Sequence, residues 1–337
     1  MNWTQYLALR AIVTFMHCFD VEPNLATAAG VGRLYCRLLP RHHKRAMEHL
    51  SLSFPDWSAE RINEVAARSI QNMFQIIMVD AMVMPRLITT SSWPRYLHVE
   101  QLGKAMERLI RNEAMIFVTG HCGNWELCGY SLPVIGYPLY ALARPLDNQL
   151  LNDWLMGIRE ARGMHVITKW GATPILQKIL RTGGRVAFIA DQNAGNQGLF
   201  VPFFGRLASS YKSIGLLAMR YKVPIMVGFA HRVDGRFEYT LSVNDVIEPD
   251  DWANRPDPLF YITARYNRAM EKAIRAEPEQ YLWAHRRWKS RPRHERLGRP
   301  VPPNLVAKLK SLPWLTPSDV EGIVETSNEA ARQETDR

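Results

Sequence analysis

Short apolar runs alternate with amphipathic stretches through the middle of this chain, and no other feature restricts the fold as strongly. Runs of strand length are predicted at residues 114–118, 139–143, 164–168, 185–190 and 223–230, with helical spacing between them. A turn at residues 233–236 and an alternating strand at 237–243 add a hairpin. Strands joined by helices usually pair in parallel. The pattern therefore predicts a single α/β domain over residues 51–295, with a mostly parallel, mixed central sheet flanked by helices.

The first of these runs ends in a cluster of residues that carry chemistry. Residues 114–129 read AMIFVTGHCGNWELCG, so His121 follows the strand directly. Asn124 is a natural N-cap for a helix that begins at Trp125 and has Glu126 in its first turn. His121 would thus lie at the carboxyl edge of the sheet, where open α/β sheets bind their ligands.

His121 and Glu126 are five positions apart, and this spacing matters. On one continuous helix such residues point about 140° away from each other. A turn over residues 122–124 would instead let the carboxylate reach the imidazole, fix its tautomer and stabilise its protonated form. The pair is a candidate general base with its orienting carboxylate. A His and a Glu at this spacing also occur by chance, so a structural cap is the alternative interpretation.

Other polar residues fall near the ends of predicted strands and helices. Arg144 follows the second run and Asp191-Gln192 follows the fourth, whereas Arg159 and Arg162 lie one turn apart near the end of a helix. Arginine binds phosphate through its planar fork, so a base beside several arginines suits deprotonation of a hydroxyl on a phosphate-bearing substrate. Each residue also has a structural interpretation. Arg159 and Arg162 could pair with Glu160 or cap carbonyls, and Asp191 could simply turn the chain.

Charge and cysteine content narrow the classes of partner and site. The 337 residues include 42 Lys and Arg against 32 Asp and Glu, a formal charge of +10, which suits nucleic acid, an acidic protein or a membrane face. The four cysteines are scattered without a CxxC pair, which predicts reduced thiols, a cytosolic environment and no structural zinc site. No metal and no cofactor are predicted, because the usual phosphate loop, dinucleotide fingerprint, zincin and serine-hydrolase motifs are missing.

The two ends of the chain differ from the middle. Residues 6–19 are largely apolar but are interrupted by Arg10 and His17, and a basic cluster follows at residues 41–45. We expect residues 1–50 to form a helical segment that docks on a membrane surface, with a core helix as the alternative for residues 6–19. Residues 296–337 are proline-rich and then acidic, and we expect a mobile tail there.

Six sequence blocks resemble a known family. HCGNWE at residues 121–126 looks like the H-x4-[D/E] box of the lysophospholipid acyltransferase superfamily. Together with RPLDN, REARG, ADQNAG, VPFFG and PEQYLWAHRRWKSRP, in this order up to residue 292, it is similar to the bacterial lipid A late acyltransferases, the lauroyl and myristoyl transferases. The resemblance implies a glycerol-3-phosphate acyltransferase-like fold.

The resemblance also implies a function. His121 would deprotonate an acceptor hydroxyl with Glu126 orienting it, and the oxygen would attack an acyl thioester directly. Arg159 and Asp191 match residues essential in the family that place a phosphosugar or support the site, with Arg144, Arg162 and Gln192 as further candidates for substrate binding. The donor would be acyl carrier protein, an acidic partner, or acyl-CoA. The acceptor would be a lipid A precursor at the cytoplasmic face of the inner membrane, where anionic lipids hold the enzyme peripherally or by one N-terminal anchor.

Three alternatives stay open from the sequence. The same blocks occur in relatives that acylate other glycolipids, such as phosphatidylinositol mannosides, or lysophospholipids. A catalytically silent lipid-binding scaffold of the same fold is a second possibility. Nucleic-acid binding is the weakest, because the arginines of residues 285–299 lack a recognisable recognition helix.

Overall fold

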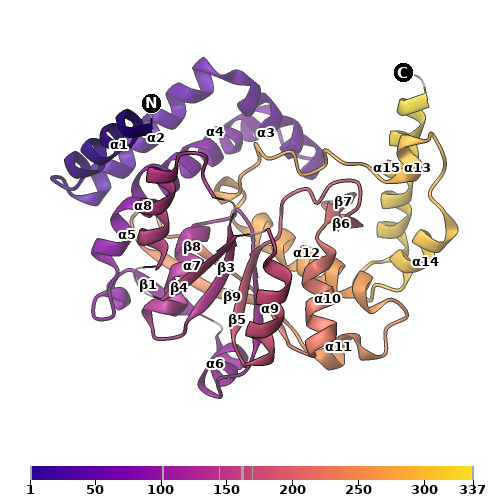
Figure 1. Ribbon diagram of the computed structural model, residues 1–337. Helices are drawn as coiled ribbons and strands as arrows, with labels where there is room; N and C mark the ends of the chain where they lie inside the picture. The colour runs from indigo at the N-terminus through magenta and orange to yellow at the C-terminus, as the bar shows by residue number, and fades with distance from the viewer. Residues whose placement is uncertain (1, 101, 144, 161–162, 169, 336–337) are drawn as a thin grey trace.

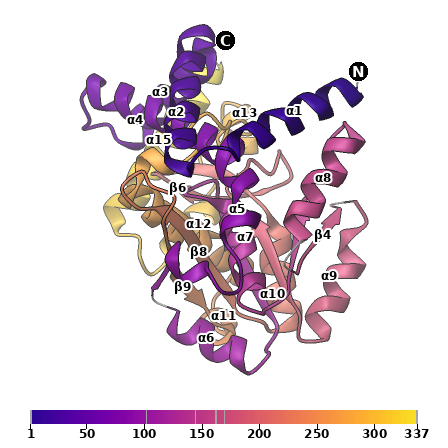
Figure 2. The same cartoon turned by 90° about the vertical axis from the view of Figure 1, so that its left-hand side faces the viewer.

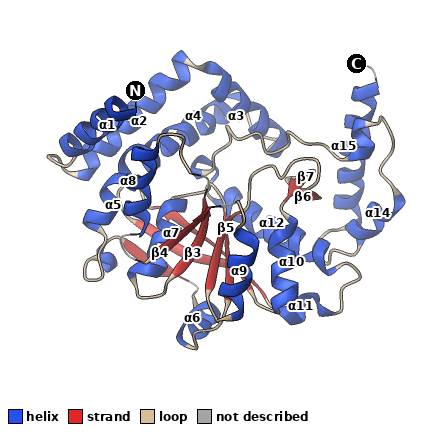
Figure 3. Ribbon diagram, viewed as in Figure 1, coloured by secondary structure: helices blue, strands red, loops and turns tan. Residues whose placement is uncertain are grey.

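A seven-stranded mixed sheet forms the centre of the protein, with helices on both faces (Figure 3). The computed structural model describes residues 2–100, 102–143, 145–160, 163–168 and 170–335. The strand order is β1-β9-β8-β2-β5-β3-β4. The five strands from β8 to β4 are mutually parallel, β9 runs antiparallel to β8, and β1 runs parallel to β9. The predicted mostly parallel sheet with an antiparallel extension is confirmed.

The strands that were expected from the apolar runs are all present. Their bounds are β2 (Met115–Thr119), β3 (Leu139–Ala143), β4 (Met164–Thr168), β5 (Arg185–Ile189), β8 (Ile225–Arg232) and β9 (Tyr239–Ile247). Three more were not foreseen: β1 (Leu97–Glu100) at the sheet edge and the separate hairpin of β6 (Leu199–Phe203) and β7 (Arg206–Ser210).

The helices fall into three groups along the chain (Figure 1). The N-terminal group is α1 (Asn2–Met16), α2 (Val21–Leu38), α3 (Pro40–Ser53), α4 (Ala59–Gln75), the π-turn η1 (Ile76–Asp80) and α5 (Ala81–Leu87). The helices among the strands are η2 (Trp93–Arg95), α6 (Gly103–Ile110), α7 (Trp125–Val134), α8 (Gln149–Glu160), α9 (Ala172–Arg181), α10 (Lys212–Tyr221), α11 (Pro249–Ala253) and α12 (Pro258–Ala276). The C-terminal group is η3 (Pro278–Gln280), α13 (Arg293–Arg296), α14 (Pro303–Lys310) and α15 (Pro317–Thr335).

Alternate residues of the central strands build two different layers. Ile116, Val118 and Val186 point into the larger core, where α9, α10 and α12 cover one face of the sheet. Phe117 and Ala187 lie on the other face, against α6 and α7. Successive side chains of a strand point to opposite faces, so continuous apolar runs are what a sheet covered on both faces requires.

Two helices start at side-chain caps, and the sequence indicated the second of them. Ser58 Oγ accepts a hydrogen bond from the backbone N–H of Arg61 at the start of α4. Asn124 Oδ1 accepts one from the N–H of Leu127, 2.9 Å away, at the start of α7. The second cap fixes the start of α7, directly after the turn between β2 and α7 that contains His121.

The C-terminal segment differs from the expectation of a mobile tail. Residues 303–310 and 317–335 form helices α14 and α15, and Val320, Ile323 and Ala331 of α15 are buried. Ser327 donates to Glu295 of α13 and contacts His294, so the helix is also tied by polar bonds. Asp319, Glu321, Glu325 and Glu329 are exposed on the outer side of α15, whose buried apolar positions are widely spaced in the sequence.

Helices α1 and α2 extend along one side of the molecule (Figure 2). Arg10 of α1 lies over the ring of Trp154 in α8, 5.6 Å from the ring centroid. No helix of the described residues is both long and apolar enough to cross a bilayer.

Candidate active site

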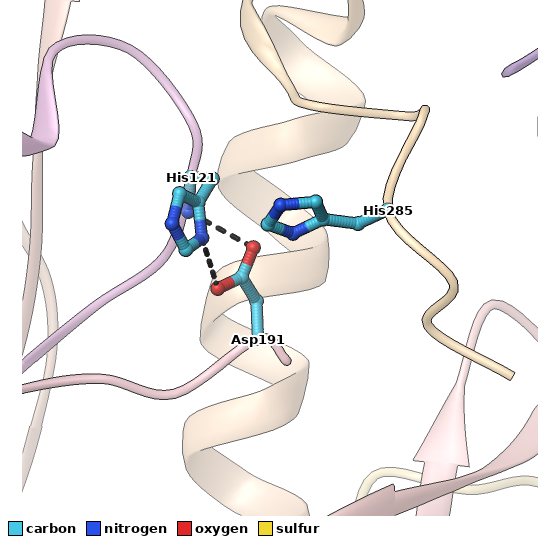
Figure 4. Close-up of side chains that lie close together, drawn as sticks. All are labelled: His121, Asp191 and His285. Atoms are coloured by element: carbon cyan, nitrogen blue, oxygen red, sulfur yellow. Dashed lines mark hydrogen bonds and ion pairs between the residues drawn. The ribbon is translucent and has the colours of Figure 1, made fainter. Parts of the chain in front are cut away.

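Asp191 holds His121 through both of its carboxylate oxygens (Figure 4). Oδ1 lies 2.8 Å from His121 Nδ1, and Oδ2 accepts the backbone N–H of His121 at 2.9 Å. Asp191 is fully buried and His121 nearly so. Burial alone would raise the pKa of the Asp191 carboxyl, but the adjacent His121 and its hydrogen bonds hold that pKa well below its usual range. The carboxylate therefore engages Nδ1 of the imidazole and leaves Nε2 outside this hydrogen bond.

Two glycines let these groups approach so closely. A Cβ on Gly120 would lie 3.2 Å from Cβ and Cγ of Asp191. Gly123 has a φ of +62°, and a Cβ there would lie 2.2 Å from the carbonyl oxygen of Ala230. Glycine is the residue that adopts this left-handed conformation without strain. The turn that contains His121, residues 119–123 (TGHCG), thus depends on both of its glycines.

Backbone hydrogen bonds attach this turn to two distant segments. The N–H of Gly123 donates to Gln280 O at 3.0 Å, and the N–H of Leu282 donates to His121 O at 2.9 Å. On the other side, the N–H of Asn124 donates to Ala230 O in β8 at 2.7 Å. The block at residues 278–292 therefore supports the His121 turn directly through its backbone.

A buried ion pair holds the residue that caps the start of α7. Asp80, at the end of the π-turn η1, is fully buried and forms an ion pair with Arg232 of β8. The same carboxylate oxygen accepts a hydrogen bond from Asn124 Nδ2 at 3.0 Å. Asn124 therefore caps α7 with its oxygen and is held by Asp80 through its nitrogen.

Glu126 does not hold His121 in this structure. Its carboxylate makes a two-pronged ion pair with Arg159 of α8, at 2.9 Å from Nε and 2.6 Å from Nη2. The sequence hypothesis paired the imidazole with Glu126, but the carboxylate on His121 Nδ1 is that of Asp191. The reason is geometric: Glu126 lies in the first turn of α7, which directs it toward α8, whereas Asp191 follows the neighbouring parallel strand β5 and faces the end of β2.

The remaining predicted site residues are placed only in part. Gln192, next to Asp191, is exposed. Arg144 and Arg162 lie outside the described residues. The structure thus brings His121 together with Asp191 and Glu126 together with Arg159. The substrate-binding roles of Arg144, Arg162 and Gln192 stay predictions.

An apolar cavity begins beside the Glu126–Arg159 pair. It contains about 1020 Å³ of space free of atoms, the part open to solvent included. Its lining runs from Thr119 and Ala143, the last residues of β2 and β3, to Leu139 at the start of β3 and to Ala105 and Leu109 of α6. The cavity therefore extends along the sheet from its carboxyl edge to its opposite edge.

Small side chains create this space between the sheet and α7. Ala141 and Ala187 are paired across β3 and β5, and Gly228 and Gly129 also line the cavity. His121 itself is not in the lining, but the adjacent Trp125 is, and the rings of Trp125 and His121 are 4.8 Å apart. One end of an apolar channel thus lies next to the histidine.

His285 is a neighbour that sequence reasoning did not single out. Its ring lies 4.6 Å from the ring of His121, centroid to centroid, and edge-on to it. Nitrogen or oxygen atoms of His121, Asp191 and His285 lie within 4.8 Å of one another, a set that could hold a metal ion. Burial and the nearby His121 lower the pKa of His285 to about 4, so its ring is neutral near pH 7. No spacing signal links it to His121; only its place in the PEQYLWAHRRWKSRP block marked the segment.

A model of the family described as bacterial lipid A biosynthesis acyltransferase matches residues 2–290. The chain belongs to this family. It is therefore an acyltransferase, as the six sequence blocks implied.

Individual relatives of the chain are also named as lipid A biosynthesis acyltransferases. The acyltransferase is 26% identical to a lipid A biosynthesis palmitoleoyltransferase of Escherichia coli over 78% of its own length and 83% of the relative's. It is 27% identical to the lauroyltransferase of the same organism over 78% and 84% of the two chains. For the E. coli myristoyltransferase the identity is 26% over 78% and 80%.

Proposed function

We propose that this acyltransferase moves a fatty acyl chain from an acyl thioester to a hydroxyl group of a lipid A precursor. The observation that carries the proposal is the buried His121–Asp191 pair at the carboxyl edge of the sheet, next to Trp125, which lines an apolar cavity. Family membership and the names of the three E. coli relatives support lipid A as the acceptor.

In the proposed mechanism His121 is the general base. Its Nε2 takes the proton of the acceptor hydroxyl while the oxygen attacks the thioester carbonyl carbon. Asp191 accepts the Nδ1 proton in a hydrogen bond and stabilises the imidazolium that forms. The carbon–sulfur bond then breaks, and the imidazolium returns the proton to the leaving thiolate. No acyl-enzyme intermediate is required.

Glu126 and Arg159 have a different proposed task. Both line the cavity at its end nearest His121, and their ion pair joins α7 to α8. We assign them to positioning the acceptor's phosphosugar beside the base, since the guanidinium of Arg159 is held in a fixed orientation by Glu126. Arg144, Arg162 and Gln192 are candidates for further contacts with the same acceptor.

The acyl chain is proposed to lie in the apolar cavity. A fatty chain laid along the sheet would place its carboxyl carbon near Trp125 and His121 and its methyl end toward α6. Each methylene that it buries is worth about 0.8 kcal/mol. The side chains of α6 would therefore limit the length of the chain that is transferred.

Acyl carrier protein is the proposed donor, with acyl-CoA as the alternative. Basic residues gather near the site, where α3 meets the segment after Trp283. Arg45 of α3 donates to Ala284 O at 3.2 Å, and Arg41, Lys44 and Arg286 around it are exposed. A basic patch at this position would steer an acidic carrier protein toward His121.

The N-terminal helices are proposed to dock on the cytoplasmic face of the inner membrane. Large apolar side chains of α1 and α2 are exposed there, among them Trp3, Leu7, Phe15, Leu34 and Leu38. Exposed apolar groups of this extent next to basic residues suit an interfacial contact with anionic lipids.

An assay with purified protein tests the function. The enzyme is incubated with acyl carrier protein or CoA thioesters of several chain lengths and with a lipid A precursor, and the lipid products are identified by mass spectrometry. We expect one added acyl chain per acceptor, and a rate at least about 10²-fold lower for His121→Ala. Acylation of another glycolipid but not of the lipid A precursor would contradict the proposed acceptor, and transfer by His121→Ala at the normal rate would contradict the mechanism.

A further inference from the structure

The three side chains of Figure 4 form a cluster that extends beyond the proposed reaction. His121, Asp191 and His285 come from the end of β2, the end of β5 and the segment after η3, and their donor atoms lie within 4.8 Å of one another. The proposed mechanism uses His121 and Asp191 and gives His285 no part.

The donor set is one that transition metals favour. Two imidazoles and one carboxylate are common protein ligands of Zn²⁺, which then keeps a fourth position for water or another small ligand. Hard ions such as Mg²⁺ prefer all-oxygen sites. Among described residues His285 Nδ1 is buried and has no hydrogen-bond partner, so one ligand of the set is not engaged by the protein.

Both other donors already face each other. His121 Nδ1 and Asp191 Oδ1 are 2.8 Å apart, a hydrogen-bond distance that requires a proton on one of the two atoms. A metal ion between them would take the place of that proton. His285 lies edge-on to the His121 ring, at 4.6 Å between centroids, and completes the set from the opposite side of the carboxylate.

We propose that Zn²⁺ binds reversibly to His121, Asp191 and His285 and thereby switches the enzyme off. When Nδ1 of a neutral imidazole binds a metal, the ring proton must be on Nε2. Nε2 then has no lone pair with which to accept the proton of a hydroxyl group. Metal binding and general-base catalysis exclude each other at His121. The loss of activity on Zn²⁺ binding rests on the proposed function, whereas Zn²⁺ binding itself does not.

Direct binding is the first test. Tag-free protein treated with a chelator and then dialysed is titrated with Zn²⁺ by calorimetry, and with Co²⁺ while the visible absorption of the bound ion is recorded. We expect one site per chain and the intense absorption of a four-coordinate Co²⁺ ion. Mg²⁺ should give no binding signal at this site. A protein that binds no Zn²⁺, or that binds it with unchanged affinity after His285→Gln, would overturn the proposal.

A matched variant controls for other histidines. His231 is also a partly buried histidine, and its Nε2 lies 3.4 Å from Cys122 Sγ, so these two residues are the nearest rival pair of ligands. His285→Gln should weaken Zn²⁺ binding about tenfold or more, whereas His231→Gln should leave it unchanged. The reverse result would place the metal at Cys122 and overturn the assignment. His285→Asn serves as a second variant if His285→Gln does not fold.

Inhibition is the second test. Zn²⁺ should abolish acyl transfer with a midpoint that matches the measured binding constant, and a chelator should restore the rate. His285→Gln, compared with its own metal-free rate, should need about tenfold more Zn²⁺. Full activity with the site saturated would overturn the switch. If the protein fails to acylate lipid A at all, the binding measurements still decide the metal site, so the two failures are distinguishable.

Discussion

Asp191 contacts His121 twice, once at the ring and once at the backbone, although the two residues are 70 positions apart in the chain. The double contact fixes both the position of the turn and the orientation of the imidazole. A carboxylate in this arrangement is the part of a general-base pair that stabilises positive charge on the ring.

Replacing Asp191 by Asn should therefore lower kcat by roughly 10²–10⁴ with a small change in KM, because the amide cannot stabilise the imidazolium. Steady-state kinetics with a saturating acyl donor measure this. A control for folding is the thermal transition of the variant. A kcat within about threefold of the unmodified enzyme would contradict the pairing.

Glu126 and Arg159 should behave as one unit in a double-mutant cycle. Glu126→Gln and Arg159→Gln each break the same two-pronged ion pair, so the double variant should lose little more activity than the worse single variant. The His121 ring resonances in a nuclear magnetic resonance spectrum should stay in place in both variants and shift in Asp191→Asn. Independent, additive losses would contradict a shared task.

Filling the deep end of the cavity should shorten the preferred acyl chain. Ala105 of α6 is buried and lines the cavity, so Ala105→Leu removes space there. Each methylene that no longer fits should cost about fourfold in kcat/KM for the longest donors and nothing for short ones. Ile110→Phe on the same helix is the control, since Ile110 is 70% exposed. A donor panel that gives the same profile for both variants would rule out this end of the cavity.

Breaking the buried Asp80–Arg232 pair should destabilise the fold strongly. Asp80→Asn leaves Arg232 buried without its carboxylate and weakens the hold on Asn124, at a cost of about 3–5 kcal/mol in the free energy of unfolding. Urea unfolding measures the change. Asp80→Leu with Arg232→Met should recover part of this loss, and a loss below about 1 kcal/mol would show that the pair contributes little.

Acid should weaken the fold through His231. Burial lowers the pKa of His231 to about 4 from an ordinary value of 6.5. Its stabilising contribution is complete above pH 6.5 and is lost as the pH falls toward 4, because only the unfolded state binds the proton in that window. Over this range the free energy of unfolding of His231→Gln should fall less steeply, by about 1.4 kcal/mol per pH unit. Parallel pH profiles from urea titrations would contradict the assignment.

The apolar runs predicted where most strands of the central sheet lie in the sequence. β3 and β4 begin and end at the predicted residues, because turn-forming and charged residues bound both stretches in the sequence. The Asn124 cap was also readable, since a helix start uses a local side chain. Strand β1, the β6–β7 hairpin and helix α15 were not, because their burial depends on distant partners rather than on local periodicity.

For the candidate active site, too, the sequence predicted some features and the tertiary structure decided the others. The sequence by itself determined that His121 and Asp191 each follow a strand and that Glu126 lies in the helix after His121. Only the tertiary structure decided that Asp191 holds His121, that Glu126 holds Arg159, and that His285 completes the cluster. Sequence spacing constrains neighbours along one chain segment, whereas these contacts join segments that only the fold brings together. The ends of the adjacent parallel strands β2 and β5 carry His121 and Asp191, helices α7 and α8 carry Glu126 and Arg159, and His285 follows η3.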